Sequence, residues 1–334
     1  MSEQHLYRCN IPPVPDRGSR PLWSVMIPTY NCAKYLRKTL ASVLAQDPGP
    51  DVMQIEVVDD CSTRDDPAAV VEELGHGRVN FYQQPENRGH IRNFETCLKR
   101  AQGNLIHLLH GDDYVRDGFY SKMQQAFEVK PEIGAAFCRH FLVNEQEDWN
   151  TISALEQPES GVLSNCLERI VVKLPIQTPS IVVRRDVYER LGGFDSRLTC
   201  GEDWEMWARI SAHYPIWYQV EPLAVYRMSS ASHTGRSVRT GQNVRDMLKV
   251  IEIIQPYLPE AIAGKLSSKA REHSAIWALS LANHMIDAGN TAAAITQIRE
   301  AFKCSNSLKV IRKSVLPILR IGKRWNWQTL QADL

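Results

Sequence analysis

The chain has 334 residues, 43% hydrophobic and 23% charged, with a formal net charge of +1. This length and apolar content suit one large domain with an appended region, and the near-zero charge gives no global field that would attract nucleic acid. No apolar run approaches the roughly twenty residues that cross a bilayer. Eight scattered cysteines without Cys-x-x-Cys pairs disfavour a zinc site and fit reduced thiols in the cytosol.

Residues 1–20 are polar and proline-rich and lack the apolar core of a secretion signal, so they are expected to form a leader segment. Short apolar runs then alternate with amphipathic helical patterns. Strands are predicted at 23–28, 54–58, 79–82 and 104–109, and helices at 32–46 and about 91–101. This alternation is typical of an α/β protein with a parallel sheet and crossover helices.

Paired carboxylates follow two of these strands. Asp59 and Asp60 end the second, and Asp112 and Asp113 close the fourth, in His110-Gly111-Asp112-Asp113. Because parallel strands end at one edge, which is where open α/β sheets bind ligands, the two pairs are expected to lie close together. Carboxylate oxygens suit Mg²⁺ or Mn²⁺. A single such pair is more often a solvated turn or helix cap, so the prediction rests on the two pairs together.

A third acidic pair, Glu202 and Asp203, stands in the segment GEDWEMW at 201–207. The apolar spacing predicts a helix that begins here, and the helix dipole favours carboxylates in its first turn. Capping alone would explain an isolated pair. With the aspartates upstream, one of the two carboxylates becomes a candidate general base.

In order along the chain, these motifs resemble the family 2 glycosyltransferases of the GT-A fold. The series is SVMIPTYN (24–31), VVDDCS (57–62), NRG (87–89), LHGDD (109–113), TPS (178–180), GGFD (192–195), GEDWEMW (201–207) and YR (226–227). The resemblance covers roughly residues 21–234. It implies a GT-A, Rossmann-like, mostly parallel sheet flanked by helices at 21–235, followed by a C-terminal helical region at 236–334.

The resemblance also implies a role for each matching residue. The expected catalytic base is Asp203, with Glu202 as a neighbouring or acceptor-binding carboxylate. Asp112 is the expected metal ligand, and His233 is a further candidate. The expected nucleotide-binding residues are Pro28, Thr29, Tyr30, Asp59, Asp60, Arg88, Asn93, Asp113 and Arg227. Related chains often carry an acid at the position of His110 and a histidine at that of Ser229, so the roles of His110 and His233 stay open.

The implied activity is the metal-dependent, inverting transfer of a sugar from a nucleoside-diphosphate sugar to an acceptor hydroxyl. The metal would be Mn²⁺ or Mg²⁺, and the acceptor a glycan, a lipid-linked glycan or a protein in cell-surface polysaccharide or glycoconjugate synthesis. A sugar-nucleotide nucleotidyltransferase is one alternative, but residues 29–33 lack the Gly-rich, basic phosphate loop it would need. A non-catalytic binding module is another, disfavoured by the intact carboxylates. The sequence does not identify the nucleotide base of the donor, the donor sugar or the acceptor.

After residue 234, helices are predicted at 243–257, 259–288 and 291–304. The tail at 309–327 mixes six Lys or Arg residues with apolar ones, a pattern typical of helices that lie on anionic membranes. Packing of its apolar face on the catalytic domain is the alternative. Pro317 argues against one unbroken helix. We therefore expect a cytoplasmic enzyme. A peripheral contact with the inner face of the cell membrane and a homodimer are both left open.

Overall fold

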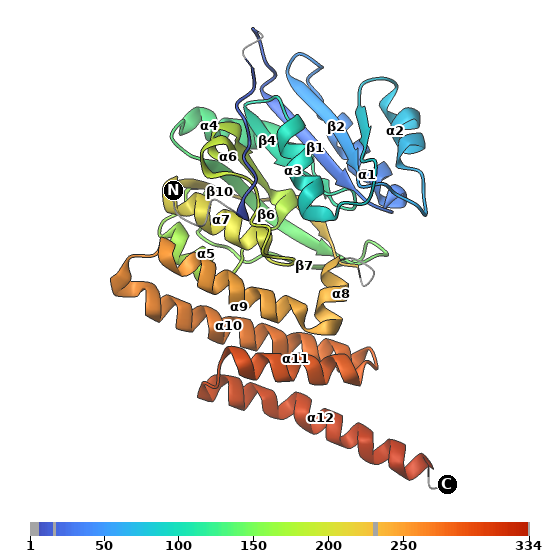
Figure 1. Cartoon of the computed structure of the whole chain (residues 1–334), viewed down its shortest axis with the longest axis vertical. Helices are drawn as coiled ribbons and strands as arrows, with labels where there is room; N and C mark the ends of the chain where they lie inside the picture. The colour runs from blue at the N-terminus through green and yellow to red at the C-terminus, as the bar shows by residue number, and fades with distance from the viewer. Residues whose placement is uncertain (1–6, 16–17, 230–232, 333–334) are drawn as a thin grey trace. The chain divides into compact units, whose positions relative to one another are not determined.

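The computed structural model describes residues 7–15, 18–229 and 233–332, without the side chains of Asn150, His233 and residues 323–332 (Figure 1). The chain forms two compact units. One, the sheet unit, comprises residues 1–166, 175–197 and 203–228, and the other, the helical unit, comprises 167–174, 198–202 and 229–334. The main segment of the helical unit begins at residue 229. Two short upstream segments, 167–174 and 198–202, also belong to that unit.

The sheet unit is built around one mixed sheet with the strand order β3-β2-β1-β4-β9-β6-β10-β5. Its strands are β1 (Trp23–Thr29), β2 (Met53–Asp59), β3 (Asn80–Gln83), β4 (Leu105–Leu108), β5 (Tyr114–Val115), β6 (Ala135–Val143), β9 (Ile181–Arg184) and β10 (Ile216–Arg227), with β7 (Trp149–Ile152) beside β6 and β8 (Gly161–Val162) beside β10. Strands β3, β2, β1 and β4 are parallel, and β6 and β10 are parallel to each other. The predicted α/β fold with a central sheet flanked by helices is confirmed, but the sheet is mixed, because the pairings of β5, β7, β8 and β9 are antiparallel.

Helices cover the sheet because its central strands are apolar on both faces, as buried parallel strands usually are. All seven residues of β1 are buried. The helices that precede residue 229 are α1 (Ala33–Leu44), α2 (Pro67–Gly75), α3 (His90–Arg100), α4 (Phe119–Val129), α5 (Cys166–Val172), α6 (Arg185–Leu191) and α7 (Glu202–His213), with a 3₁₀ turn, η2, at Thr178–Ser180. Of these, α5 belongs to the helical unit apart from its first residue. One apolar cluster joins alternate residues of β1 and β2 to the inner faces of α1, α2 and α4.

The described residues of the amino-terminal segment pack on the sheet unit. The carbonyl oxygen of Cys9 accepts the N–H of Gly193 at 2.9 Å, and that of Pro12 accepts Nη2 of Arg185 at 2.9 Å. Ile11 is buried. A Cβ at Gly193 would lie 2.4 Å from Cys9 Sγ, so the approach requires glycine there. The segment expected to be a leader therefore forms part of the packing of this unit in its described residues.

The helical unit consists mainly of neighbouring helices, which Figure 1 shows side by side. They are α8 (His233–Thr240), α9 (Gln242–Ile254), α10 (Glu260–Asp287), α11 (Thr291–Cys304) and α12 (Leu308–Ala332), with a 3₁₀ turn, η3, at Gln255–Tyr257. Alanines such as Ala278, Ala282 and Ala294 let α10 and α11 pack closely. The bounds predicted for α9, α10 and α11 agree with the structure to within a few residues, whereas α8 was not predicted.

The expectation that Pro317 breaks the tail helix is wrong, because α12 continues through it. Proline removes one N–H from the helix ladder. The ring of Pro317 lies on the buried side of α12 with Val310 and Ser314. Packing of this side offsets the missing hydrogen bond. Among the described residues, no helix has both the length and the apolar content to cross a membrane.

Candidate active site

The motif His110-Gly111-Asp112-Asp113 leaves the carboxyl end of β4 and lies against the end of β1. The N–H of Gly111 donates to the carbonyl oxygen of Pro28 at 3.0 Å. A Cβ at Gly111 would lie 2.5 Å from Thr29 Cγ2, closer than real Cβ atoms come to their neighbours. Glycine is therefore required between the histidine and the aspartates, and it brings both carboxylates to the edge where β1 and β2 end.

The side chain of Thr39 in α1 hydrogen-bonds the backbone of this loop. Its Oγ1 lies 3.1 Å from the carbonyl oxygen of Gly111 and 2.6 Å from that of Asp113. The side chain is fully buried, and its single proton serves one carbonyl at a time. Sequence reasoning missed Thr39, since a threonine inside an amphipathic helix carries no sign of this contact.

His110, Asp112 and Asp113 form the cluster that could hold a cation. One ligand atom of each lies within 4.8 Å of the others. Asp113 Oδ1 accepts the N–H of Arg227 at 2.8 Å, and Asp113 Oδ2 accepts no hydrogen bond from the residues described. Burial, and then the charge of Asp112, raise the pKa of Asp113 well above its usual range; burial also raises the pKa of Asp112. A buried carboxylate beside a partly buried one, each repelling the other, suits a divalent cation.

Arg227, the last residue of β10, contacts the loop His110-Gly111-Asp112-Asp113, which is called the metal motif below. Its Nε donates to the carbonyl oxygen of Asp112 at 3.0 Å, and its Nη2 donates to Glu147 Oε1 at 2.7 Å. The guanidinium is buried and lies 4.5 Å from the ring centroid of Tyr35. Glu147 also pairs with Lys38 of α1. The expected diphosphate contact of Arg227 stays a prediction, and in this structure its guanidinium links the metal motif to the loop at 144–148.

Replacement of Arg227 by lysine is expected to weaken metal-dependent nucleotide binding by about tenfold or more, as when groups that orient metal ligands are removed. A lysine ammonium lacks the planar fork that donates at once to the carbonyl oxygens of Asp112 and Asn144 and to Glu147. The affinity can be measured by calorimetry with Mn²⁺. Arg184→Lys is the matched control, because that arginine pairs with Asp186 at the opposite edge of the sheet. A lower melting temperature with unchanged affinity would show that Arg227 only stabilises the fold.

At the end of β2, the carboxylates of Asp59 and Asp60 accept hydrogen bonds from other residues of the protein. Asp59 accepts the N–H of Ser62 at 2.9 Å and Nε2 of Gln83 at 3.1 Å. Asp60 accepts the N–H groups of Arg88 and Gly89 at 2.8 and 2.9 Å, and thereby fixes the turn at 87–89. Their expected contacts to base or ribose stay predictions. Both carboxylates are buried beside the end of β1, since the N–H of Asp60 donates to the carbonyl oxygen of Thr29 at 2.9 Å.

The other expected nucleotide contacts differ in exposure. Pro28 and Thr29 are buried at the end of β1, whereas the side chain of Tyr30 is exposed. Arg88 is exposed in its turn. Asn93 is buried, and its Nδ2 donates to the carbonyl oxygen of Val58 at 2.8 Å. The amide of Asn93 therefore supports the packing of α3 against β2, while Tyr30 and Arg88 remain accessible to a ligand.

Asp203 lies in the first turn of α7, one helical turn before Trp207. An aromatic cluster connects this face of α7 to the metal motif: His110 stacks on Phe94 with centroids 5.1 Å apart, Phe94 lies 5.4 Å from Phe194, and Phe194 lies 6.3 Å from Trp207. Residues four apart share a helix face. The structure thus brings the Asp203 face of α7 and the metal motif onto one aromatic cluster. The sequence analysis included Phe194 in the motif GGFD but did not identify Phe94.

A buried ion pair fixes α7 in place. Arg209 Nε donates to Glu205 Oε1 at 3.0 Å, and Arg209 Nη2 donates to Glu205 Oε2 at 2.8 Å and to the carbonyl oxygen of Gly193 at 2.9 Å. Arg8 adds a third hydrogen bond to Glu205 at 3.0 Å. A buried pair with this many partners orients its helix firmly, and removal of one member leaves an uncompensated charge.

The remaining expected site residues are His233 and Glu202. His233 begins α8 in the helical unit, and its side chain lies outside the described residues. Glu202 precedes Asp203 at the start of α7 and is partly buried. Asp203 is also partly buried, and its Oδ1 accepts the N–H of Trp204 at 2.7 Å.

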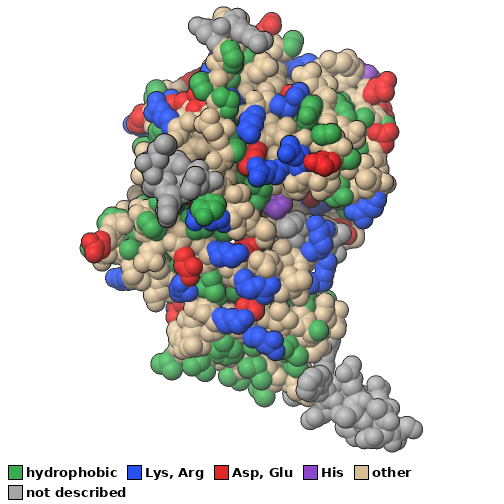
Figure 2. Space-filling model, in the orientation of Figure 1, with side chains coloured by type: hydrophobic (Ala, Val, Ile, Leu, Met, Phe, Trp, Pro, Cys, Tyr) green, Lys and Arg blue, Asp and Glu red, His purple; other side chains and the backbone are tan. Residues whose placement is uncertain are grey.

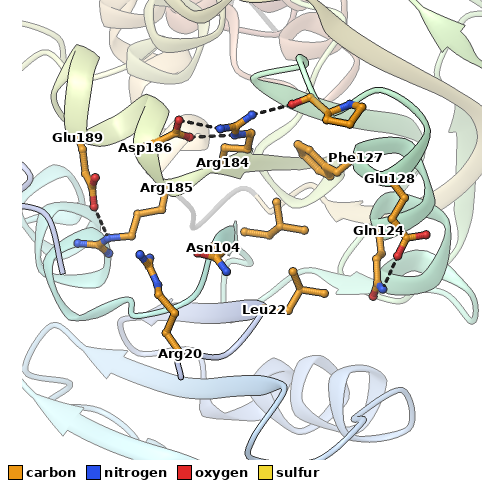
Figure 3. A pocket seen from close by; sticks show the side chains of 12 residues that line it. Arg20, Leu22, Asn104, Gln124, Phe127, Glu128, Arg184, Arg185, Asp186 and Glu189 are labelled. Carbon is orange, nitrogen blue, oxygen red and sulfur yellow. Dashed lines mark hydrogen bonds and ion pairs between the residues drawn. The ribbon is translucent and has the colours of Figure 1, made fainter. Parts of the chain in front are cut away.

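A separate cavity of about 460 Å³ lies at the opposite edge of the sheet, where β1 and β4 begin (Figure 3). Its three arginines are engaged: Arg20 donates to the carbonyl oxygen of Gln102, Arg184 to Asp186, and Arg185 to Glu189. The aspartates of the metal motif do not line it. This cavity is therefore distinct from the candidate site.

Known relatives match the chain in sequence. The family described as "Glycosyl transferase family 2" matches residues 24–192, which is 169 of 334 residues. An uncharacterized protein of Mycobacterium tuberculosis, MT1568, is 27% identical over 78% of this chain and 82% of its own length. The poly(ribitol-phosphate) beta-N-acetylglucosaminyltransferase TarS of Staphylococcus aureus is 35% identical over 28% of this chain and 16% of its own length.

Solved structures share the fold. The crystal structure of TarS residues 1–349 with UDP-GlcNAc has a TM-score of 0.61 at 17% identity, and covers 84% of this chain and 91% of that one. The mannosyltransferase PcManGT of Pyrobaculum calidifontis, in complex with GDP-Man and Mn²⁺, has a TM-score of 0.53 at 20% identity, and covers 95% and 90% of the two chains. Both agree with a GT-A sheet. The chain is a glycosyltransferase and belongs to glycosyl transferase family 2.

Proposed function

We propose that this glycosyltransferase is metal-dependent and inverting, and moves a sugar from a nucleoside-diphosphate sugar to an acceptor hydroxyl in the synthesis of a cell-surface polysaccharide or glycoconjugate. The observation that carries the proposal is the cluster of His110, Asp112 and Asp113 at the sheet edge. Further support comes from the solved relatives, whose complexes contain UDP-GlcNAc or GDP-Man with Mn²⁺. The TarS relationship supports a cell-envelope acceptor.

The residues present fit a divalent cation. Asp112 is the proposed ligand, with Asp113 and His110 as neighbours that can bind directly or through water. Oδ2 of buried Asp113 lies 3.7 Å from His110 Nδ1 and accepts no hydrogen bond from the described residues, and a buried carboxylate oxygen without a hydrogen bond favours a cation there. When bound, Mn²⁺ or Mg²⁺ would neutralise charge that develops on the departing nucleoside diphosphate. A role for His233 as a further ligand remains part of the proposal.

The chain's own residues would perform the remaining tasks. Asp203 would remove the proton from the acceptor hydroxyl as that oxygen attacks the anomeric carbon, and Glu202 would help to hold the acceptor. Attack from the side opposite the leaving group inverts the configuration in a single displacement. The proposed walls of the nucleotide site are the end of β1 with Tyr30, and the turn with Arg88. Arg227 would position Asp112 through its carbonyl oxygen.

We place this activity in the cytoplasm. Cysteines such as Cys97 and Cys138 are buried free thiols. Free thiols, in a chain whose cysteines form no Cys-x-x-Cys pair, fit a reducing compartment.

Nucleotide binding with and without metal tests the proposal. UDP, GDP, TDP and CMP are added to the full chain in the presence and absence of Mn²⁺, and the melting temperature is recorded. A ligand at a hundred times its dissociation constant adds about 2.7 kcal/mol to the free energy of unfolding, which shifts the melting temperature by roughly two degrees or more. We expect a metal-dependent shift with one nucleoside diphosphate. Metal-independent shifts, or none with any nucleotide, would contradict the proposed donor site.

A further inference from the structure

Helix α12 presents apolar side chains on two sides. The inner side includes Val310 and Ser314, which are buried in the core of the helical unit with α10 and α11 as neighbours. The outer side carries large apolar side chains that no described part of the chain covers. These residues, called the outer stripe, are Leu308, Ile311, Val315, Leu316, Ile318 and Leu319. Leu308 is 86% exposed, and Leu316 and Leu319 are each 59% exposed.

The outer stripe is continuous along the helix. Most of its members recur three or four residues apart, which places them on one face of an α-helix. Figure 2 shows hydrophobic side chains gathered along the lower border of the described molecule, where Figure 1 places α12. Single exposed apolar residues are common, but a contiguous patch marks an interaction surface.

The charges of α12 indicate what the surface binds. The helix carries six Lys or Arg residues and no Asp or Glu. Lys309 pairs with Glu272, and Arg320 pairs with Asp287, both acids lying on α10. Arg312 and Lys313 are exposed and form no ion pair with any residue in the described ranges. Arg312 lies on the same face as the stripe, four residues after Leu308 and four before Leu316, and Lys313 lies beside it. An apolar face that also carries unneutralised cations on long side chains is complementary to a surface that is apolar beneath and anionic above.

A second copy of the chain is a poorer occupant. Symmetric pairing of two outer stripes places the same patch of each copy against the other. Arg312 and Lys313 would then lie close to the same two cations of the second copy, and such like-charge contacts oppose association. A membrane with anionic headgroups meets both the apolar and the cationic side chains. Trp325 and Trp327 follow in the sequence of the same helix, and tryptophan is enriched at membrane interfaces.

We propose that the outer stripe of α12, together with its exposed cations, binds an anionic phospholipid surface. The helix lies in the headgroup plane, its apolar side chains enter the acyl boundary, and Arg312 and Lys313 contact lipid phosphates. Binding is reversible, and it weakens as salt screens the charges. This surface is independent of the carboxylates of the sheet edge, so it goes beyond the proposed transferase activity.

Vesicle co-sedimentation of the full chain tests the proposal without any nucleotide. The vesicles are phosphatidylcholine alone or with about 30 mol% phosphatidylglycerol, a fraction that gives the surface negative potential. The test variant is Val315→Glu with Leu319→Glu. The matched control is Val129→Glu with Leu155→Glu, which replaces a valine and a leucine of similar exposure in the sheet unit. Arg312→Glu with Lys313→Glu isolates the electrostatic part. Melting temperature and elution volume establish that each variant is folded.

The wild-type chain and the matched control are expected to partition onto the anionic vesicles, and about tenfold less onto phosphatidylcholine alone, since cations near an anionic surface add to affinity. Both α12 variants should lose about tenfold or more of this partition. The absence of wild-type binding, equal binding to both vesicles, or unchanged binding of folded α12 variants would overturn the proposal. A dimeric wild type that becomes monomeric in the stripe variant without any vesicle binding would also overturn it, in favour of self-association. Failure here leaves the metal-dependent nucleotide shift intact, so the two proposals fail separately.

Discussion

Asp112→Asn is expected to abolish the effect of Mn²⁺ on nucleotide binding and to lower turnover by about a hundredfold or more, because charge stabilisation by the cation is lost. Asparagine keeps the volume of the side chain and removes its charge. Melting temperatures with nucleotide, with and without Mn²⁺, measure the first effect, and transfer assays measure the second. Asp117→Asn is the matched control, since Asp117 is exposed in the next turn of the chain.

The metal-free form of this variant should be at least as stable as the wild type at neutral pH. Burial raises the pKa of Asp112, and the charge of Asp112 helps to raise that of Asp113. With a carboxyl whose pKa is raised by folding, the protein loses stability as the pH rises from the unfolded-state pKa of that carboxyl to its raised folded-state pKa. Removal of one of the two charges therefore relieves this cost. This outcome separates loss of the metal from misfolding. An unchanged Mn²⁺ response in the folded variant would place the ligand elsewhere.

The sequence predicted the first half of the sheet because its signals are local. Strands β1, β2 and β4 are buried on both faces, so each reads as a continuous apolar run, and each is followed by residues that end it. Their observed bounds fall within two residues of the predicted ones. The parallel arrangement followed from the alternation with helices, and with it the meeting of the two aspartate pairs at one edge.

The second half of the sheet was not predicted, since its pairing joins distant parts of the chain. Strand β9 is antiparallel to both β4 and β6, and β6 pairs with β10 some eighty residues later. No local periodicity encodes such partners. The contacts of Arg227 were not predicted for the same reason. Its side chain donates to the carbonyl oxygen of Asp112 and to the carboxylate of Glu147, which belong to two other loops of the chain.

The candidate site was likewise predicted only in part. Its chemical residues were recognisable from their types and order, but the residues that hold them were not. Glu205 and Arg209 are four residues apart on a helix, a spacing that usually indicates an exposed pair worth a few tenths of a kcal/mol. Here both are buried, because Arg8 and the carbonyl oxygens at 191–193 surround them. Only the tertiary structure reveals that this pair orients α7.

Asp203→Asn is expected to lower turnover by about a thousandfold, within the usual contribution of a general base, while nucleotide affinity with Mn²⁺ changes by about twofold or less. Asparagine can still accept the N–H of Trp204 that Asp203 Oδ1 accepts, so the start of α7 should keep its conformation. Only the ability to take a proton is removed. Calorimetry with the nucleoside diphosphate and steady-state transfer assays separate the two quantities.

Glu202→Gln is the matched comparison, because it neutralises the adjacent carboxylate at the start of the same helix. If Glu202 only helps to hold the acceptor, its variant should raise the acceptor KM and lower turnover by about tenfold at most, since other contacts remain. The reverse pattern, with turnover lost in Glu202→Gln and kept in Asp203→Asn, would make Glu202 the base. Loss of nucleotide binding in Asp203→Asn would instead assign Asp203 to the donor, because a base acting on the acceptor contributes nothing to the affinity of the nucleotide alone.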